Sequence, residues 1–271
     1  MSSTLISDRV RIEINDSIAH VFLARPEKHN GMDMPMLQAV ITAAKKMAAN
    51  KEIRAVVLSG DGPSFCAGLD FKTVMGQPAK AALAYSQLWW PMRNDFQSWS
   101  IAWRSVGVPV IAAIHGNCFG AGIQLAMGAD IRVSTADAKI SIMEAKWGLI
   151  PDMGGVALMR ELLRIDVAKE LTLTGRIVSG QQAAELGLVT HVHNDPVAKA
   201  LELANEIATR SPDSVAAAKF LLQEGWHGNE DETLTSERRW QRRIMLGKNQ
   251  RIAVKGNSTK EEPVFDSRRV K

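Results

Sequence analysis

Hydrophobic and polar residues follow two different periods along the first two thirds of the chain. Short apolar runs rich in β-branched residues predict strands at residues 10–16, 18–24 and 54–60. Between the last two runs, residues 34–49 carry apolar positions at helical spacing, and Asp33 stands before them as a predicted N-cap. Because a helix between two strands favours their parallel pairing, the pattern indicates an α/β protein.

Similar patterns continue to about residue 195. They predict strands at 109–116 and 188–193, and two strands within 130–144 on either side of a Thr-Ala-Asp-Ala turn. Residues 148–155 are predicted to form a loop that precedes helices, and residues 78–105 have a helical pattern. We expect four tryptophans of this last stretch in the core or in a pocket wall, namely Trp89, Trp90, Trp99 and Trp103.

Beyond residue 195 the pattern is almost entirely helical, to about residue 247. This change predicts two parts: residues 1–195, with strands, helices and the active site, and a helical region over residues 196–271. The charged tail from residue 257 onward is expected to be loose.

Composition narrows the class of protein only a little. The chain has 271 residues, 46% hydrophobic and 23% charged, which fits a globular protein with a sizeable core. Two cysteines are too few for a disulfide framework or a metal site, and the N-terminus lacks the apolar segment of a signal peptide. No stretch approaches ~18 apolar residues, so we expect a cytoplasmic protein without a membrane span. The formal charge of +4 suits an anionic small molecule as well as nucleic acid.

Two segments repeat one arrangement, in which a buried strand is followed by a turn of small residues. The first is VVLSGDGPSFCAGLD, which ends at Asp70, and the second is PVIAAIHGNCFGAG, which ends at Gly122. Ala67 and Ala121 could each direct a backbone N–H at a ligand, and two convergent N–H groups form an oxyanion hole. Each segment alone is also explained by an ordinary tight turn, whereas the pair in this order is more specific.

Four motifs in this order resemble the crotonases, which are the enoyl-CoA hydratase/isomerase superfamily. They are LARPEKHNGMD, SGDGPSFCAGLDFK, PVIAAIHGNCFGAGIQLAMGADIR and SIMEAKWGLIPDMGG. The resemblance, over about residues 10–250, implies an α/β spiral of ββα repeats whose C-terminal helical region serves oligomerisation and pocket closure. It further implies a homotrimer or homohexamer, an acyl-CoA substrate, and no cofactor or metal, since coenzyme A is part of the substrate.

The resemblance also assigns binding roles. The thioester oxygen would lie between the N–H groups of Ala67 and Ala121 and would be stabilised there as an enolate. The residues that correspond to the family's CoA contacts are Arg25, Lys28, Ala67, Gly68, Leu69 and Asp70. For Asp70 we expect a structural capping role rather than catalysis.

Hydratases of this family use two glutamates, and the matching positions here are Gln124 and Glu144. An amide carries no proton at working pH, so Glu144 is the predicted acid/base and Gln124 a positioning group. Asp152 matches an aspartate of relatives that shift double bonds in dienoyl thioesters, although those relatives also have an aspartate in place of Gln124. Asp152 is therefore either a second proton carrier or a cap of the following helix.

These residues favour double-bond isomerisation, with hydration as the alternative. A different class of function is suggested by ERRWQRR (237–243), since arginines around a tryptophan can bind single-stranded nucleic acid, and some crotonase-fold proteins bind RNA. We expect these arginines to make subunit contacts or to bind CoA phosphates instead, because an RNA-binding protein has no need of Glu144 beside an oxyanion hole.

Overall fold

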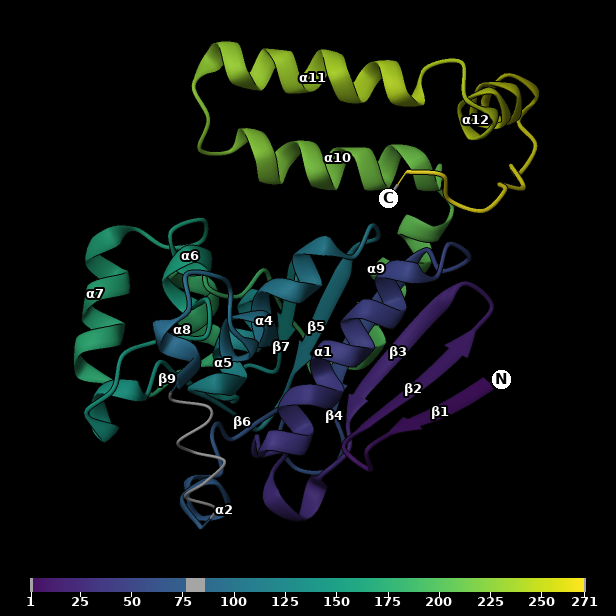
Figure 1. The fold of residues 1–271 in the computed structure, drawn as a ribbon. Coiled ribbons are helices and arrows are strands. Elements are labelled where there is room, and N and C mark those ends of the chain that lie inside the picture. Colours follow the sequence, from purple (N-terminus) through teal and green to yellow (C-terminus); the bar gives the residue numbers. More distant parts are fainter. Residues whose placement is uncertain (1, 77–85, 271) are drawn as a thin grey trace.

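The computed structural model describes residues 2–76 and 86–270, so the part of the predicted helical stretch that covers residues 78–85 lies outside the described residues. Its main feature is a seven-stranded sheet in the order β1-β2-β3-β4-β5-β7-β10 (Figure 1). These strands are β1 Ser2–Ile6, β2 Val10–Asn15, β3 Ile18–Leu23, β4 Ala55–Gly60, β5 Val110–Ile114, β7 Ile131–Ser134 and β10 His191–Val192. The first three pair antiparallel, and the pairs from β3 to β10 are parallel, as the α/β pattern predicted.

A second, three-stranded sheet has the order β6-β8-β9. Its strands are β6 Asn117–Phe119, β8 Lys139–Ser141 and β9 Val178–Ser179. Two successive strand pairs, β5 with β6 and β7 with β8, each contribute one strand to each sheet, and helices follow each pair. This is the spiral of ββα repeats, and it explains why the two strands predicted within 130–144 do not form a hairpin.

Helices cover both faces of the large sheet. On one face, α1 (Met34–Ala49) packs into the main core, and its N-cap Asp33 accepts a 2.8 Å hydrogen bond from the backbone N–H of Met36, as predicted. On the other face, Ala200 and Ala204 of α9 (Pro196–Ala208) pack against buried residues of the central strands. The first helix of the predicted C-terminal region is therefore part of the sheet packing.

The remaining helices are shorter or lie around these layers. Before the second sheet come η1 Pro26–Lys28, α2 Phe71–Met75, η2 Gln87–Trp89, α4 Asp95–Ile101 and η3 Ala102–Ser105. After β6 come α5 Ala121–Met127, η4 Glu144–Trp147, α6 Gly155–Met159, α7 Ile165–Thr174 and α8 Gly180–Glu185. Among the helices of residues 2–76 and 86–270, none has the length and apolar character that crossing a membrane requires.

Two of the four tryptophans lie where the sequence predicted them. Trp99 and Trp103 are fully buried in the core. The prediction was wrong for Trp89 and Trp90, which are 79% and 65% exposed. Pro91 follows them and the chain is not helical there, so the helical periodicity that would have turned them inward is interrupted.

Strand β1 was not predicted. Its residues pair with β2 from Ser2 opposite Ile14 to Ile6 opposite Val10. The sequence SSTLI is short and largely polar, so it lacks the apolar alternation of a half-buried strand. At the edge of the sheet, pairing with β2 is enough to order it.

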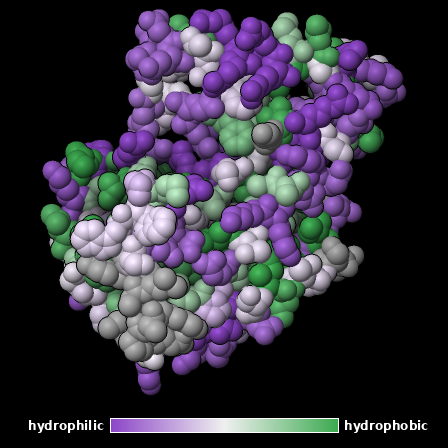
Figure 2. All heavy atoms as spheres, in the orientation of Figure 1, coloured by the Kyte–Doolittle hydropathy of each residue, from purple (hydrophilic) through white to green (hydrophobic). Residues whose placement is uncertain are grey.

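The last three helices project beyond the sheet layers, as Figure 1 shows. They are α10 Pro212–Gly225, α11 Glu230–Ile244 and α12 Lys248–Thr259. The face of this region seen in Figure 2 is largely hydrophilic. The helical prediction for this part is confirmed, whereas the prediction of a loose tail is wrong. Residues 257–259 belong to α12, and Arg268 is buried, with its N–H bonded to the Lys51 carbonyl at 3.1 Å.

The basic run 237–243 lies on α11 and turns its tryptophan inward. Trp240 is buried against Phe220, and its indole N–H donates to Glu224 at 2.8 Å. Arg239 pairs with the same carboxylate, and Arg243 lies over the Trp240 ring. Because the ring is enclosed, it offers no face on which a base could stack, which removes the main argument for nucleic-acid binding.

Candidate active site

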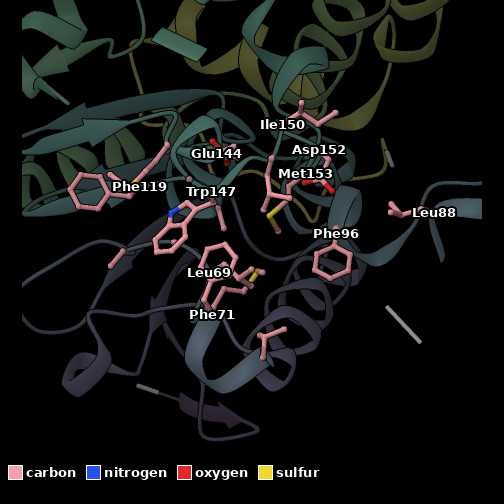
Figure 3. Close-up of a pocket in the computed structure, with 18 residues that line it drawn as sticks. Leu69, Phe71, Leu88, Phe96, Phe119, Glu144, Trp147, Ile150, Asp152 and Met153 are labelled. Carbon is pink, nitrogen blue, oxygen red and sulfur yellow. The ribbon is translucent and has the colours of Figure 1, made fainter. Parts of the chain in front are cut away.

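A cavity of about 290 Å³ is lined by residues from several separate segments of the chain (Figure 3). Three segments make up most of its wall: residues 67–71 after β4, residues 119–121 between the end of β6 and the start of α5, and residues 143–153 around η4. The two turns predicted from the sequence to converge therefore face one cavity.

The two turns are held together by pairing between Cys66 and Cys118. The Cys66 N–H donates to the Asn117 carbonyl, and the Phe119 N–H donates to the Cys66 carbonyl, both at 3.0 Å. A Cβ on Gly122 would collide with the Cys66 carbonyl, so glycine is required for this approach. Burial raises the pKa of the Cys66 thiol to about 12, so it is not a nucleophile at neutral pH.

The structure corrects the prediction that Ala67 supplies an oxyanion-hole N–H. That N–H donates to the His29 carbonyl at 2.9 Å and is therefore already used in the fold. Parallel pairing with Met32 uses the carbonyl of Gly68 and the N–H of Asp70. The Leu69 N–H between these two groups must then point away from Met32.

Leu69 lines the cavity, and its N–H has no acceptor within the described part of the chain. Gly68 has a φ of +96°, and a Cβ there would lie 3.0 Å from the Phe119 carbonyl and 3.9 Å from the Ala121 nitrogen. Glycine thus brings Leu69 close to the second turn. Ala121 is the first residue of α5, where a helix leaves its N–H groups without intrahelical acceptors. Leu69 and Ala121 therefore each offer a backbone donor on the two facing turns.

Glu144 is the first residue of η4 and lies against the second turn, since a Cβ on Gly120 would be 3.4 Å from its Oε1. Oε1 accepts a 2.5 Å hydrogen bond from the Gln124 amide. Oε2 has no hydrogen-bond partner among the described residues, and Glu144 lines the cavity. Burial is the largest of the effects that raise its pKa, and the charge of Asp152 raises it further.

Gln124 is fully buried in α5 and is absent from the described cavity wall. Its Oε1 accepts hydrogen bonds from the N–H groups of Met153 at 2.9 Å and Gly155 at 3.0 Å. Together with its bond to Glu144, these contacts engage both ends of the amide. Gln124 thus fixes the general base candidate and the loop that carries Asp152 relative to each other.

Asp152 lies on the same cavity wall as Glu144 (Figure 3). Its residue surface is open to solvent, yet surrounding protein atoms raise its pKa by desolvation. The N-cap of α6 is Gly154, without a side-chain hydrogen bond, so the alternative that Asp152 caps this helix is wrong.

The predicted CoA-binding residues differ in their surroundings. Lys28 is exposed in η1, whereas Arg25 is buried, donates to the Gly31 carbonyl at 2.9 Å and pairs with Asp70 at 3.0 Å. Asp70 caps α2 by accepting a 3.0 Å hydrogen bond from the Thr73 N–H, which confirms its capping role. Burial raises the pKa of Asp70, but its hydrogen bonds from Thr73 and Arg25 outweigh this and hold it below the usual value.

Sequence reasoning missed the aromatic part of the wall. Phe71, Phe96 and Trp147 line the cavity and come from α2, α4 and η4. The sequence did contain a signal for two of these rings, because Phe71 and Trp147 come shortly after the predicted site residues Asp70 and Glu144. Within residues 2–76 and 86–270, no cluster of three His, Cys, Asp or Glu side chains has a metal-binding arrangement, and the absence of a cofactor stays a prediction.

Known proteins are similar to this chain in sequence and in fold. The sequence profile of the enoyl-CoA hydratase/isomerase family matches residues 13–268. The chain belongs to this family. It is 32% identical to an enoyl-CoA hydratase of Mycobacterium tuberculosis, over 92% of either chain. It is 31% identical to the mitochondrial Delta(3,5)-Delta(2,4)-dienoyl-CoA isomerase of Dictyostelium discoideum, over 83% of this chain and 80% of that protein.

A solved enoyl-CoA hydratase/isomerase-family structure, the enoyl-CoA hydratase of Bacillus anthracis, superposes with a TM-score of 0.87 and 26% identity, over 95% of this chain and 98% of that one. The family assignment and the crotonase fold inferred from the four motifs are thus confirmed, and the chain is an enzyme of the enoyl-CoA hydratase/isomerase type. Since its relatives include both hydratases and isomerases, family membership leaves the reaction to be argued from the site.

Proposed function

We propose that this enzyme shifts a carbon–carbon double bond within an enoyl-CoA thioester and that Glu144 carries the proton. The observation that supports this best is that the two carboxylate oxygens of Glu144 differ in their hydrogen bonding. Its Oε1 is held by the Gln124 amide, and its Oε2 has no partner in the described part of the chain. One carboxylate oxygen is thereby positioned, while the other, although buried, has no hydrogen bond within the described part of the chain that would compete for a substrate proton.

The thioester oxygen would accept hydrogen bonds from the N–H groups of Leu69 and Ala121. In a Δ3-enoyl thioester, Glu144 would then remove a proton from C2, and the electron pair would spread over the thioester oxygen and C4 as a dienolate. Return of the proton from Glu144 to C4 gives the Δ2 product and restores the carboxylate. Asp152, on the same wall, is the candidate to carry the proton where it must travel farther along the chain.

Hydration makes a different demand, because water must be held and deprotonated while a proton is delivered to carbon. Gln124 cannot exchange a proton, and both ends of its amide are engaged by Glu144, Met153 and Gly155. Gln124 is also fully buried and is not among the described residues that line the cavity, so it is poorly placed to orient a water there. Hydration is kept as a second candidate because Asp152 could act as the other acid/base.

The test compares products formed from crotonyl-CoA, a Δ3-enoyl-CoA and a dienoyl-CoA, separated by mass and ultraviolet absorbance. We expect isomerisation to be faster than water addition, and Glu144→Gln to lower turnover by ~10²–10⁴. Water addition that exceeds isomerisation in the wild type would overturn the proposal, as would near-normal turnover in Glu144→Gln.

A second variant examines Gln124 itself. Gln124→Glu restores a second carboxyl group, so the ratio of hydration to isomerisation should rise. Two carboxyl groups in contact raise the pKa of one of them, which leaves a proton available for delivery. Gln241→Glu, on the exposed side of α11, is the matched control and should leave the ratio unchanged. An unchanged ratio in a folded Gln124→Glu variant would contradict the role given to this amide.

A further inference from the structure

The acyl part of the cavity is bounded by aromatic rings on two sides. Phe71 and Trp147 stack with their ring centroids 4.4 Å apart and their planes at 28°. Figure 3 shows Phe96 on the other side of the cavity, with Met153 between the two sides and Ile150 at the edge beside Asp152. All five side chains line the same space.

Two of these rings, Phe71 and Trp147, closely follow residues of the reaction centre in the sequence. Phe71 comes two residues after Leu69, whose N–H is a candidate donor to the thioester oxygen. Trp147 ends the short helix that begins at Glu144. Because these residues line one cavity, a group attached a few carbons beyond the thioester can reach the rings while its reacting carbons lie at Glu144.

The rim of the cavity is apolar and open. Trp147, Leu149 and Ile150 are 59%, 51% and 73% exposed. Adjacent exposed apolar residues of this size mark a surface that a ligand covers. An open tryptophan face stacks with another planar group more favourably than its area alone would give.

The described part of this wall carries no positively charged side chain. Its ionisable side chains, among the described residues, are Glu144 and Asp152. Both would repel a second carboxylate on the acyl group, and no Lys, Arg or His side chain of the described wall could offset that repulsion. The described residues of the wall therefore disfavour acyl groups with a terminal negative charge.

The volume is sufficient for a ring. An apolar cavity of about 150 Å³ is large enough to bind benzene. The cavity here, of about 290 Å³, has room for a phenyl ring together with the carbons that join it to the thioester.

We infer that the substrate of this site is a thioester whose acyl group is uncharged and carries a planar, aryl ring a few carbons beyond the reacting double bond. The inference rests on the proposed function for the identity of the thioester. It adds that Phe71, Phe96 and Trp147 determine which acyl group is accepted.

Binding of unreactive thioesters tests this without relying on catalysis. Titration calorimetry would compare 5-phenylpentanoyl-CoA with undecanoyl-CoA, which has the same number of acyl carbons. Burial of apolar area alone favours the longer alkyl chain. We expect the phenyl compound to bind about tenfold more tightly, which corresponds to about 1.4 kcal/mol. Adipoyl-CoA should bind at least tenfold more weakly than hexanoyl-CoA.

Variants then test which side chains cause the preference for the phenyl compound. Trp147→Leu and Phe96→Leu should each bring the ratio of the phenyl and undecanoyl dissociation constants close to one. Trp226→Leu, at the exposed end of α10, is the matched control and should keep the wild-type ratio.

Each outcome has a defined meaning. Undecanoyl-CoA binding as tightly as the phenyl compound, adipoyl-CoA binding as tightly as hexanoyl-CoA, or an unchanged ratio in Trp147→Leu would overturn the inference and leave the proposed isomerisation standing. Failure of all four thioesters to bind would overturn both.

Discussion

At the scale of single residues, the chemistry depends on how the neighbouring groups affect the hydrogen bonding and the protonation of the Glu144 carboxylate. Gln124 occupies one oxygen of Glu144, and Asp152 contributes negative charge from the same wall. Neither neighbour neutralises Glu144, and burial favours its protonated form. Gln124 and Asp152 therefore help to set the pKa of Glu144, and a hydratase with two glutamates has a carboxylate in place of this amide.

The Asp152→Asn substitution measures this influence. Removing the negative charge at residue 152 should lower the raised pKa of Glu144, so the base ionises at lower pH. The acid limb of the kcat/KM profile, which reports the free enzyme, should then move toward lower pH. Asp137→Asn, in an exposed turn, should leave the limb in place. A limb that stays or moves upward in Asp152→Asn would show that the two carboxyl groups do not interact.

Backbone donors can be tested by replacing one amide with an ester. Incorporation of the α-hydroxy acid of leucine at position 69 removes the N–H and keeps the side chain. We expect kcat to fall by ~10²–10³, the usual cost of losing one oxyanion-hole donor. The corresponding hydroxy acid at Ala67 removes its bond to His29, and should lower the free energy of unfolding by about 1 kcal/mol while kcat changes little. The reverse pattern would restore Ala67 as the donor.

At the scale of elements, a buried guanidinium organises the loop that carries the first turn. Arg25 pairs with Asp70, lies 3.6 Å from Asp33 and donates to the Gly31 carbonyl. It thereby connects the N-caps of α1 and α2. Its position inside the loop explains how a residue of the RPEKHN motif can serve the site without facing a ligand.

Arg25→Ala should therefore act mainly on stability. Removal of one partner of a buried ion pair costs about 3–5 kcal/mol, which denaturant unfolding at neutral pH would reveal. Because the pKa of Asp70 lies below its usual value, the bonds to its ionised form stabilise the fold above about pH 3.9 and are lost as pH falls further. The difference in the free energy of unfolding between wild type and variant should therefore become smaller at acidic pH. A variant with normal stability but weaker CoA binding would instead identify Arg25 as a ligand contact.

Helices and strands were predicted best from the sequence where their buried residues form a continuous run or a clear apolar face. β4 has five consecutive buried residues, and α1 has both an apolar face and a capping aspartate, so each was found with nearly correct bounds. Strand β1 was missed because an edge strand needs no apolar face. Glu144 was identified from its motif, but the donor at Leu69 was not, because the direction of an N–H depends on pairing with Met32. The aromatic wall was missed because its members come from separate helices.

At the scale of the whole molecule, a buried lysine joins the projecting helices to the core. Lys219 of α10 donates to the carbonyls of Val108 at 3.0 Å and Trp103 at 3.3 Å, and pairs with Asp130 at 2.7 Å. Burial lowers its pKa, and the Asp130 charge opposes that shift. The helices α10–α12 thus have a fixed point of attachment, as a role in subunit contact would require. A homotrimer or homohexamer remains a prediction.

Lys219→Met should loosen this attachment. The variant leaves Asp130 without its cation, and we expect the free energy of unfolding to fall by about 3 kcal/mol. Hydrogen exchange should quicken in α10 and α11 while the amides of residues 143–153 keep their protection. Lys255→Met, on the exposed face of α12, provides the comparison. Uniform loss of protection across the chain would show that the helices and the core unfold as one unit.

The pairing of Cys66 with Cys118 has a consequence for the order of events during folding. The two residues lie far apart in the sequence, since Cys66 follows β4 and Cys118 lies in β6, in the next turn of the spiral. Contacts of such long sequence separation form late, because the intervening chain must first be ordered. Helical circular dichroism from α10–α12 should therefore recover early in refolding, whereas turnover should return only when the second repeat docks on the first. On the ribosome, the same dependence means that no nascent chain ending before α5 can be active, however well its first strands have formed.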